Sequence, residues 1–175
     1  MRTRTLSILL LAAVAAMAQD GSKQVIKMLK EIGKDASPQA IERVAPYLKD
    51  PDAEVRREAV TALVRLGGLA SLDKLVEATK DPDEEIQIRA TDGLVNFYLP
   101  GYVEFGLTAS LKRVGTSLKG KFSDVNDQVI PPYVQVREDV VLALGALARG
   151  GISEQSRANA ARGVGILRGK AAVAD

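Results

Sequence analysis

Apolar side chains recur every three or four residues along most of the chain, and this spacing is the period of an amphipathic α-helix. The apolar stripes predict helices over residues 25–32, 38–48, 51–66, 72–76, 82–97, 103–118, 136–147 and 156–167. Alternation of apolar and polar residues, which indicates a β-strand, is nowhere sustained. The pattern therefore predicts an all-α protein.

Residues 49–66 are repeated at residues 80–97, with an offset of 31 residues. Both segments open with Lys-Asp-Pro-Asp. Further matches fall at Glu54/Glu85, Ala59/Ala90, Leu63/Leu94 and Val64/Val95. Because turn residues and apolar positions agree together, the segments indicate an internal repeat, in which neighbouring units stack to bury a shared core.

Two further copies follow less regularly. The third is predicted over residues 136–147, at an offset of 50, and the fourth over residues 156–167, at an offset of 20. In the fourth copy Arg157 lies over Arg56, but a first helix is missing from the unit. Residues 100–135 are expected to be an insertion between the second and third copies.

The turn before each repeated helix holds two acids and a proline. We expect Asp50 and Asp81 to be the N-caps, with Pro51 and Pro82 at the first helical position. Arginines early in the repeated helices, Arg56 and Arg137, are expected to bridge acids on an adjacent repeat.

This helix–turn–helix unit resembles the HEAT-like repeats, specifically the short type first associated with phycobilisome lyases. The resemblance rests on residues 49–56 with Ala59, Ala62, Leu63 and Gly67, and on residues 81–86 with Ala90 and Leu94. It covers residues 38–99 well and residues 134–170 loosely. It departs from the family pattern at Gln87, where arginine is usual. It implies an α–α superhelix of about three to four irregular helical hairpins.

The insertion is the expected contact surface. It is predicted to hold the helix 103–118 and a loop over residues 120–133 that ends in Pro131-Pro132. Long loops are usually functional or disordered, and aromatic and basic side chains are frequent anchors in interfaces. The candidate partner-binding residues are Tyr102, Lys112, Arg113, Lys119, Lys121, Phe122 and Tyr133.

The first eighteen residues have the order of a secretory signal. Two arginines precede an apolar run over residues 6–16, and Ala16-Met17-Ala18 offers small residues for cleavage before Gln19. An uncleaved anchor and a buried first helix are the alternatives. We expect a repeat domain over residues 19–175, exported to the periplasm or the exterior, with no membrane span after signal removal.

The composition excludes several kinds of catalytic and metal-binding site. The chain has no His and no Cys, which excludes a Ser-His-Asp triad, a His-ligated zinc, a thiol nucleophile and a disulfide. There are 24 Lys and Arg against 22 Asp and Glu, and without Arg2 and Arg4 the two sets are equal. A neutral mature chain gives no general attraction for nucleic acid. We expect no enzymatic activity, cofactor, metal or small-molecule substrate.

Two motifs in the insertion partly match known ligand-binding motifs. Residues 115–121 match the start of a phosphate-binding loop, but Phe122 stands where Ser or Thr is needed and no strand precedes it. Residues 124–127 cluster oxygen ligands, but the glycine and glutamate of a calcium loop are missing. A helix end and a turn are the interpretations we favour.

Basic residues gather near the C-terminus at Arg149, Arg157, Arg162, Arg168 and Lys170, opposed only by Glu154. A solvated helix face is the first interpretation of this cluster, an acidic protein partner the second and nucleic acid the third. Residues 171–175 look like the start of a helix that is cut short, which indicates a fragment or a truncated member of a longer array.

The predicted function is a non-enzymatic adaptor of the cell envelope or exterior, which binds another protein through a curved helical surface, with the contact at residues 103–133. The resemblance also implies an alternative, an enzyme or enzyme subunit related to the bilin lyase proteins. A second alternative is a nucleic-acid-binding protein of the HEAT-like class.

Overall fold

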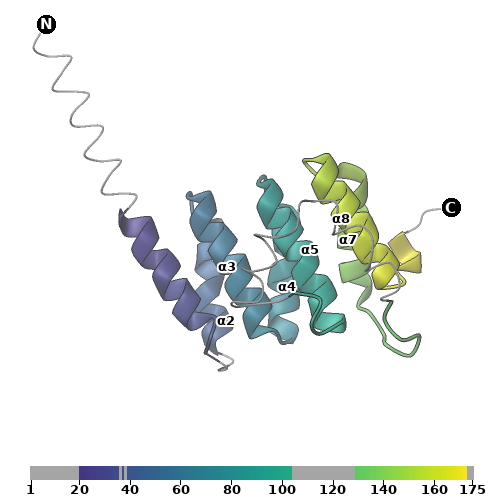
Figure 1. Ribbon diagram of the computed structural model, residues 1–175, viewed down its shortest axis with the longest axis horizontal. Coiled ribbons are helices and arrows are strands. Elements are labelled where there is room, and N and C mark those ends of the chain that lie inside the picture. The colour runs from purple at the N-terminus through teal and green to yellow at the C-terminus, as the bar shows by residue number, and fades with distance from the viewer. Residues whose placement is uncertain (1–19, 36, 38, 104–128, 173–175) are drawn as a thin grey trace, which may run out of the picture.

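The computed structural model describes residues 20–35, 37, 39–103 and 129–172 (Figure 1). A first helix covers residues 20–32. It is followed by α2 (Gln39–Val44), η1 (Ala45–Lys49), α3 (Ala53–Leu66), α4 (Leu69–Ala78), α5 (Glu84–Tyr98), α7 (Glu138–Gly150), α8 (Glu154–Ile166) and η3 (Lys170–Ala172). No β-strand occurs in these described ranges, and the predicted all-α class is confirmed.

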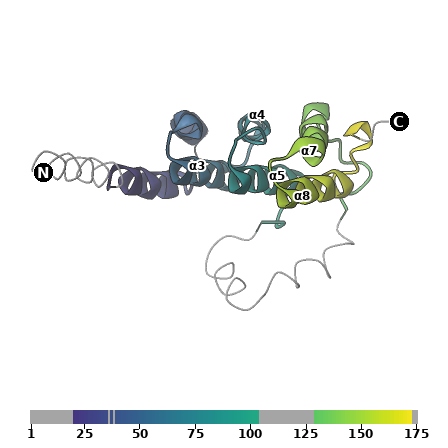
Figure 2. The ribbon, with the colours of Figure 1, turned by 90° about the horizontal axis from the view of Figure 1, so that it is seen from above.

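The helices form two layers (Figure 2). Helix 20–32, α3, α5 and α8 lie side by side in one, which we call the second-helix layer. The other, the first-helix layer, holds α2 with η1, α4 and α7. Each member of the first-helix layer packs on the helix that follows it, so the described chain is one helix and then three stacked hairpins. This arrangement is a helical-repeat solenoid.

Helix α8 repeats the register of α3 and α5. Near the start of each of these helices a side chain donates to the carbonyl oxygen six residues earlier. The three bonds are Arg56 Nη1 to Asp50 at 2.9 Å, Gln87 Nε2 to Asp81 at 2.9 Å and Arg157 Nη1 to Gly151 at 3.0 Å. The predicted match of Arg157 with Arg56 is confirmed.

The predicted third copy is wrong in its register. Residues 136–147 were expected to lie over α3, but α7 belongs to the first-helix layer and packs on α8 as the other half of one hairpin. The unit that ends in α8 therefore has its first helix. An apolar stripe is common to both helices of a hairpin, so the stripe alone did not distinguish them.

The caps also differ from the prediction. The N-caps are Asp52, which accepts from Glu54 N, and Asp83, which accepts from Ile86 N. Asp50 and Asp81 lie two residues before these caps, and each accepts from the backbone N of the cap residue, at 2.8 and 2.9 Å. The prolines therefore lie in the turn and not in the helix, because two acids flank each proline and the second one caps.

The core lies between the two layers and is built of Leu, Val, Ile and Ala. Small residues let neighbouring second helices approach. A Cβ added to Gly93 in α5 would lie 2.4 Å from Val64 Cγ2, and one added to Gly163 in α8 would lie 3.3 Å from Thr91 Cγ2. Glycine is therefore needed at Gly93 for packing and not for its dihedral angles.

The C-terminal residues fold back onto α7. The 3₁₀ helix η3 packs there, with Arg149 Nη1 donating to Ala172 O at 3.1 Å and Ala172 lying against Gly145. Residues 171 and 172, where a helix was predicted to start, lie in the 3₁₀ helix η3, and residues 173–175 lie outside the described range. The predicted signal at residues 1–18 lies outside it as well. No described helix has both the length and the apolar character that a membrane span requires.

Candidate partner-binding site

The insertion leaves the solenoid at a fixed point. Helix α5 ends in a turn in which Tyr102 N donates to Leu99 O at 3.1 Å. Asn96, in the last turns of α5, accepts from Val103 N through Oδ1 at 2.9 Å. The side chain of Asn96 thus takes the place of a backbone acceptor and orients the chain as it departs.

Where the chain returns from the insertion, over residues 129–137, it is fixed at two points. Ile130 is 2% exposed, and its N donates to Ile166 O near the end of α8 at 3.0 Å. Arg137 N donates to the Tyr98 hydroxyl of α5 at 3.1 Å. We call the two anchored pieces, residues 99–103 and 129–137, the insertion root.

The two tyrosines of the root have different surroundings. Tyr102 is half-buried against the core, and burial raises its pKa. The Arg162 guanidinium of α8 hydrogen-bonds to the Tyr102 hydroxyl. Tyr133 is 82% exposed. The geometry therefore assigns a packing role to Tyr102 and leaves Tyr133 available to a ligand.

The other predicted partner-binding residues lie outside the described range. These are Lys112, Arg113, Lys119, Lys121 and Phe122. The two partial ligand-binding motifs, at residues 115–121 and 124–127, also lie outside it. Among the residues that the structure does describe, no cluster of three or more carboxylates is placed to hold a metal ion.

Charged side chains tie the helices of the second-helix layer to one another. Arg57 of α3 forms a bidentate pair with Asp83, with Nε–Oδ1 at 3.0 Å and Nη2–Oδ2 at 2.7 Å. This pairing lowers the pKa of Asp83. Arg89 of α5 donates back to Thr61 Oγ1 of α3 at 2.7 Å. Helices α3 and α5 are thus held by contacts in both directions.

The same layer continues to α8. Asn159 Nδ2 donates to Asp92 Oδ1 of α5 at 2.9 Å. Next to these contacts Glu58 is largely buried, and burial raises its pKa against the opposing effect of nearby Lys30 and Arg65. The Arg65–Glu58 contact is 3.8 Å, an ion pair too long to be a hydrogen bond. The sequence pattern did not predict this network, although the repeat places Glu58, Arg89 and Asn159 at the same position of α3, α5 and α8.

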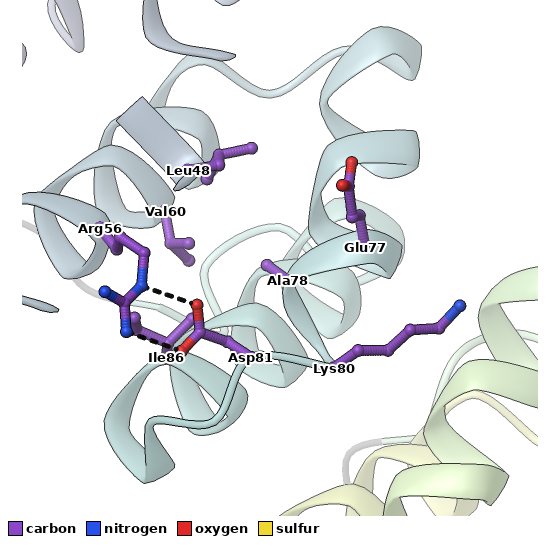
Figure 3. Close-up of a pocket in the computed structure, with 8 residues that line it drawn as sticks. All are labelled: Leu48, Arg56, Val60, Glu77, Ala78, Lys80, Asp81 and Ile86. Atoms are coloured by element: carbon purple, nitrogen blue, oxygen red, sulfur yellow. Dashed lines mark hydrogen bonds and ion pairs between the residues drawn. The ribbon is translucent and has the colours of Figure 1, made fainter. Parts of the chain in front are cut away.

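A cleft of about 300 Å³ lies between the α2–α3 and α4–α5 hairpins, near the start of α5 (Figure 3). Its floor is apolar and consists of Leu48, Val60, Ala78 and Ile86. Arg56 and Asp81 face each other across one side of the cleft, joined by two hydrogen bonds. Glu77 and Lys80 complete the lining, so its two basic and two acidic side chains carry no net charge, and the apolar floor suits an apolar side chain more than an ion.

Arginines bridge adjacent repeats as expected. Arg56 pairs with Asp81 of the next unit, and Arg137 Nη2 reaches Asp73 of α4 at 2.7 Å. Arg137 is the N-cap residue of α7, so it lies before the helix and not inside it.

A comparison with known families finds a match. The family described as HEAT repeats matches residues 7–95, which include helix 20–32 and nearly all of the chain to the end of α5. The match begins inside the segment predicted to be a secretory signal. A comparison with curated proteins finds no match.

Proposed function

Because the chain belongs to the HEAT-repeat family, we propose that it is a non-enzymatic adaptor that holds a partner protein at its insertion root and the adjacent second-helix layer. The observation that carries the proposal is the contrast within the root. Its backbone is anchored at Asn96, Tyr98 and Ile166, yet Tyr133 is left 82% exposed.

The physical argument is preorganisation. A binding surface that is already rigid loses little conformational entropy when a partner docks, so more of the contact energy appears as affinity. Tyrosine is enriched among the residues that contribute most to interfaces, because it offers a large rigid surface with a polar tip. An exposed tyrosine on an anchored backbone has both properties.

The cellular setting is part of the proposal. The signal-like order of residues 1–18 supports export to the periplasm or the exterior, and the short Asp-Pro-Asp hairpins support membership of the phycobilisome-lyase-type subgroup. The lack of His and Cys throughout the sequence supports a binding role over catalysis.

The test is crosslinking in the cells that make the protein. A photoreactive amino acid is placed at Tyr133 in the full chain, and at Glu42 of α2 as a matched control in the other layer. The proposal expects Tyr133 to capture one dominant protein that Glu42 does not. Capture of the same proteins at both positions, or of none, would overturn it.

The purified full-length chain separates the two alternatives. A bound open-chain tetrapyrrole would give visible absorbance and would favour the bilin lyase class. Affinity for duplex DNA that falls steeply with salt would favour a nucleic-acid-binding protein. The proposed function expects neither signal.

A further inference from the structure

The pairing between Arg56 and Asp81 is repeated in altered form one hairpin later. Gln87 keeps the bond to the carbonyl six residues before it, and its Oε1 accepts from Ile152 N of the next turn at 3.1 Å. Gly151 stands at the position of Asp81, so the next turn offers a backbone donor where the earlier one offers a carboxylate. At both junctions, the side chain at this register reaches forward into the following unit.

Arg157 is the third residue at this register, on the last described helix. Its Nη1 donates to Gly151 O at 3.0 Å, as Arg56 Nη1 does to Asp50 O. In Arg56 the remaining groups, Nε and Nη2, bind Asp81. In Arg157 these two groups have no hydrogen-bond partner among the described residues. The guanidinium is therefore held through Nη1 as that of Arg56 is, and no carboxylate of the described residues occupies its Nε and Nη2.

The positions next to Arg157 on α8 also correspond to positions of α3 and α5 that are buried between repeats. Val60 and Val64 of α3, and Thr91 and Val95 of α5, are buried by the unit that follows. Their counterparts on α8, Ala161 and Gly165, are exposed, as is Ala158 at the register of Arg57. The outward side of α8 thus continues the established interface between repeats.

The charge of the chain segment that contains this surface indicates the sign of its ligand. Between residues 149 and 172 there are five basic residues and one acid, Glu154. A second copy stacked end to end would bring helix 20–32 onto α8. Residues 20–34 contain four lysines against two acids, so this contact would place like charges together.

We propose that an acidic partner protein docks on the outward side of α8. The partner contacts α8 with a helical hairpin of its own, and a carboxylate in the turn of that hairpin pairs with Nε and Nη2 of Arg157. The hairpin takes the place that the α4–α5 hairpin has on α3. The proposal rests on the proposed adaptor function and deepens it, because it assigns the partner a charge, a local structure and a point of attachment.

The test places a photoreactive amino acid at Ala158 of the full chain in the cells that make it, with Lys27 at the other end as control. We expect Ala158 to capture one protein, crosslinked at a turn with Asp or Glu before a helix. Arg157→Gln should keep the Gly151 bond, as Gln87 keeps its own, and should raise the Kd for the purified partner at least tenfold. The matched charge control Arg43→Gln, on the exposed face of α2, should change it less than twofold.

Several outcomes would overturn the inference. One is an affinity that Arg157→Gln leaves unchanged in a variant with native helicity. Another is a crosslink from Ala158 to a second copy of this chain. A third is capture at Tyr133 with none at Ala158, which would contradict the α8 site but leave the proposed function standing. Failure of capture at both positions would contradict both.

Discussion

Arg56 and Asp81 join one repeat to the next through a nearly buried bidentate pair, with Nε–Oδ2 at 2.9 Å and Nη2–Oδ1 at 3.2 Å. The two side chains are 14% and 11% exposed. Removal of one partner of such a pair leaves the other charge desolvated and uncompensated. The contact therefore contributes to the order of the stack as well as to its stability.

We expect Arg56→Ala and Asp81→Ala each to lower the free energy of unfolding by about 3 kcal/mol. The double variant should be less destabilised than the sum of the two, with a coupling of about 2 kcal/mol. Urea unfolding of the full chain measures this. Lys49→Ala is the control, because the exposed Lys49–Glu77 pair should contribute less than about 0.5 kcal/mol. If the double variant lost as much free energy of unfolding as the two single variants together, the result would contradict the pairing.

The close contact of α5 with the preceding hairpin gives a second prediction. Gly93→Ala would place a methyl group 2.4 Å from Val64 Cγ2 and 3.1 Å from Leu75 Cδ1, and should destabilise the protein by about 2 kcal/mol through overpacking. Gly165→Ala on α8 meets no atom within 4 Å and should stabilise it by about 0.5 kcal/mol through helix propensity. Thermal unfolding of both variants compares them, and a neutral Gly93→Ala would be inconsistent with this packing.

The pairing of Arg57 with Asp83 predicts a pH dependence. The guanidinium holds the pKa of Asp83 below its usual 3.8, so the folded state binds this proton more weakly than the unfolded state does. The resulting stability is present above the unfolded pKa and is lost as pH falls below about 3.8 through the folded pKa. Arg57→Met should remove most of this loss and raise the carboxyl pKa of Asp83, as measured by carbon-detected NMR titration.

Asp35 supplies the control for that titration. Its pKa is lowered chiefly by a hydrogen bond from Ser37 N and only weakly by Arg43. Arg43→Met should therefore leave the Asp35 titration nearly unchanged. Equal effects of the two arginine substitutions on their neighbouring acids would show that general charge, and not the bidentate contact, sets these pKa values.

The two tyrosines of the insertion root should separate folding from binding. Tyr102→Ala should lower the free energy of unfolding by about 2 kcal/mol, because a half-buried ring leaves the core. Tyr133→Ala should change the free energy of unfolding by less than about 0.5 kcal/mol and should raise the Kd for the captured partner about tenfold or more. The checks are urea unfolding and a direct Kd measurement. Destabilisation by Tyr133→Ala would contradict the division of roles.

The fold class and much of the register could be predicted from the sequence because both are local properties. The offset of 31 residues placed Gln87 over Arg56, and the alignment of Arg157 with Arg56 agrees with the hydrogen bonds that all three make. The HEAT resemblance was equally local, since it rested on the turn residues and on small and apolar positions of one hairpin.

What could not be predicted depended on choices between equivalent local patterns. An apolar stripe fits either helix of a hairpin, so α7 was assigned to the wrong layer. Asp-Pro-Asp offers two acids for one cap, and it is Asp52 that caps while Asp50 accepts from Asp52 N. The side-chain network of Arg57, Arg89 and Asn159 requires knowledge of which helices are neighbours, which periodicity does not supply.

The most direct test of the adaptor account is hydroxyl-radical footprinting of the full chain, alone and with the protein captured at Tyr133. The account predicts that Tyr133 loses reactivity in the complex, because the insertion root is covered. Met28, 37% exposed on the helix at the far end of the array, should stay as reactive as in the free chain. Unchanged reactivity of Tyr133, or protection of Met28 instead, would contradict the account.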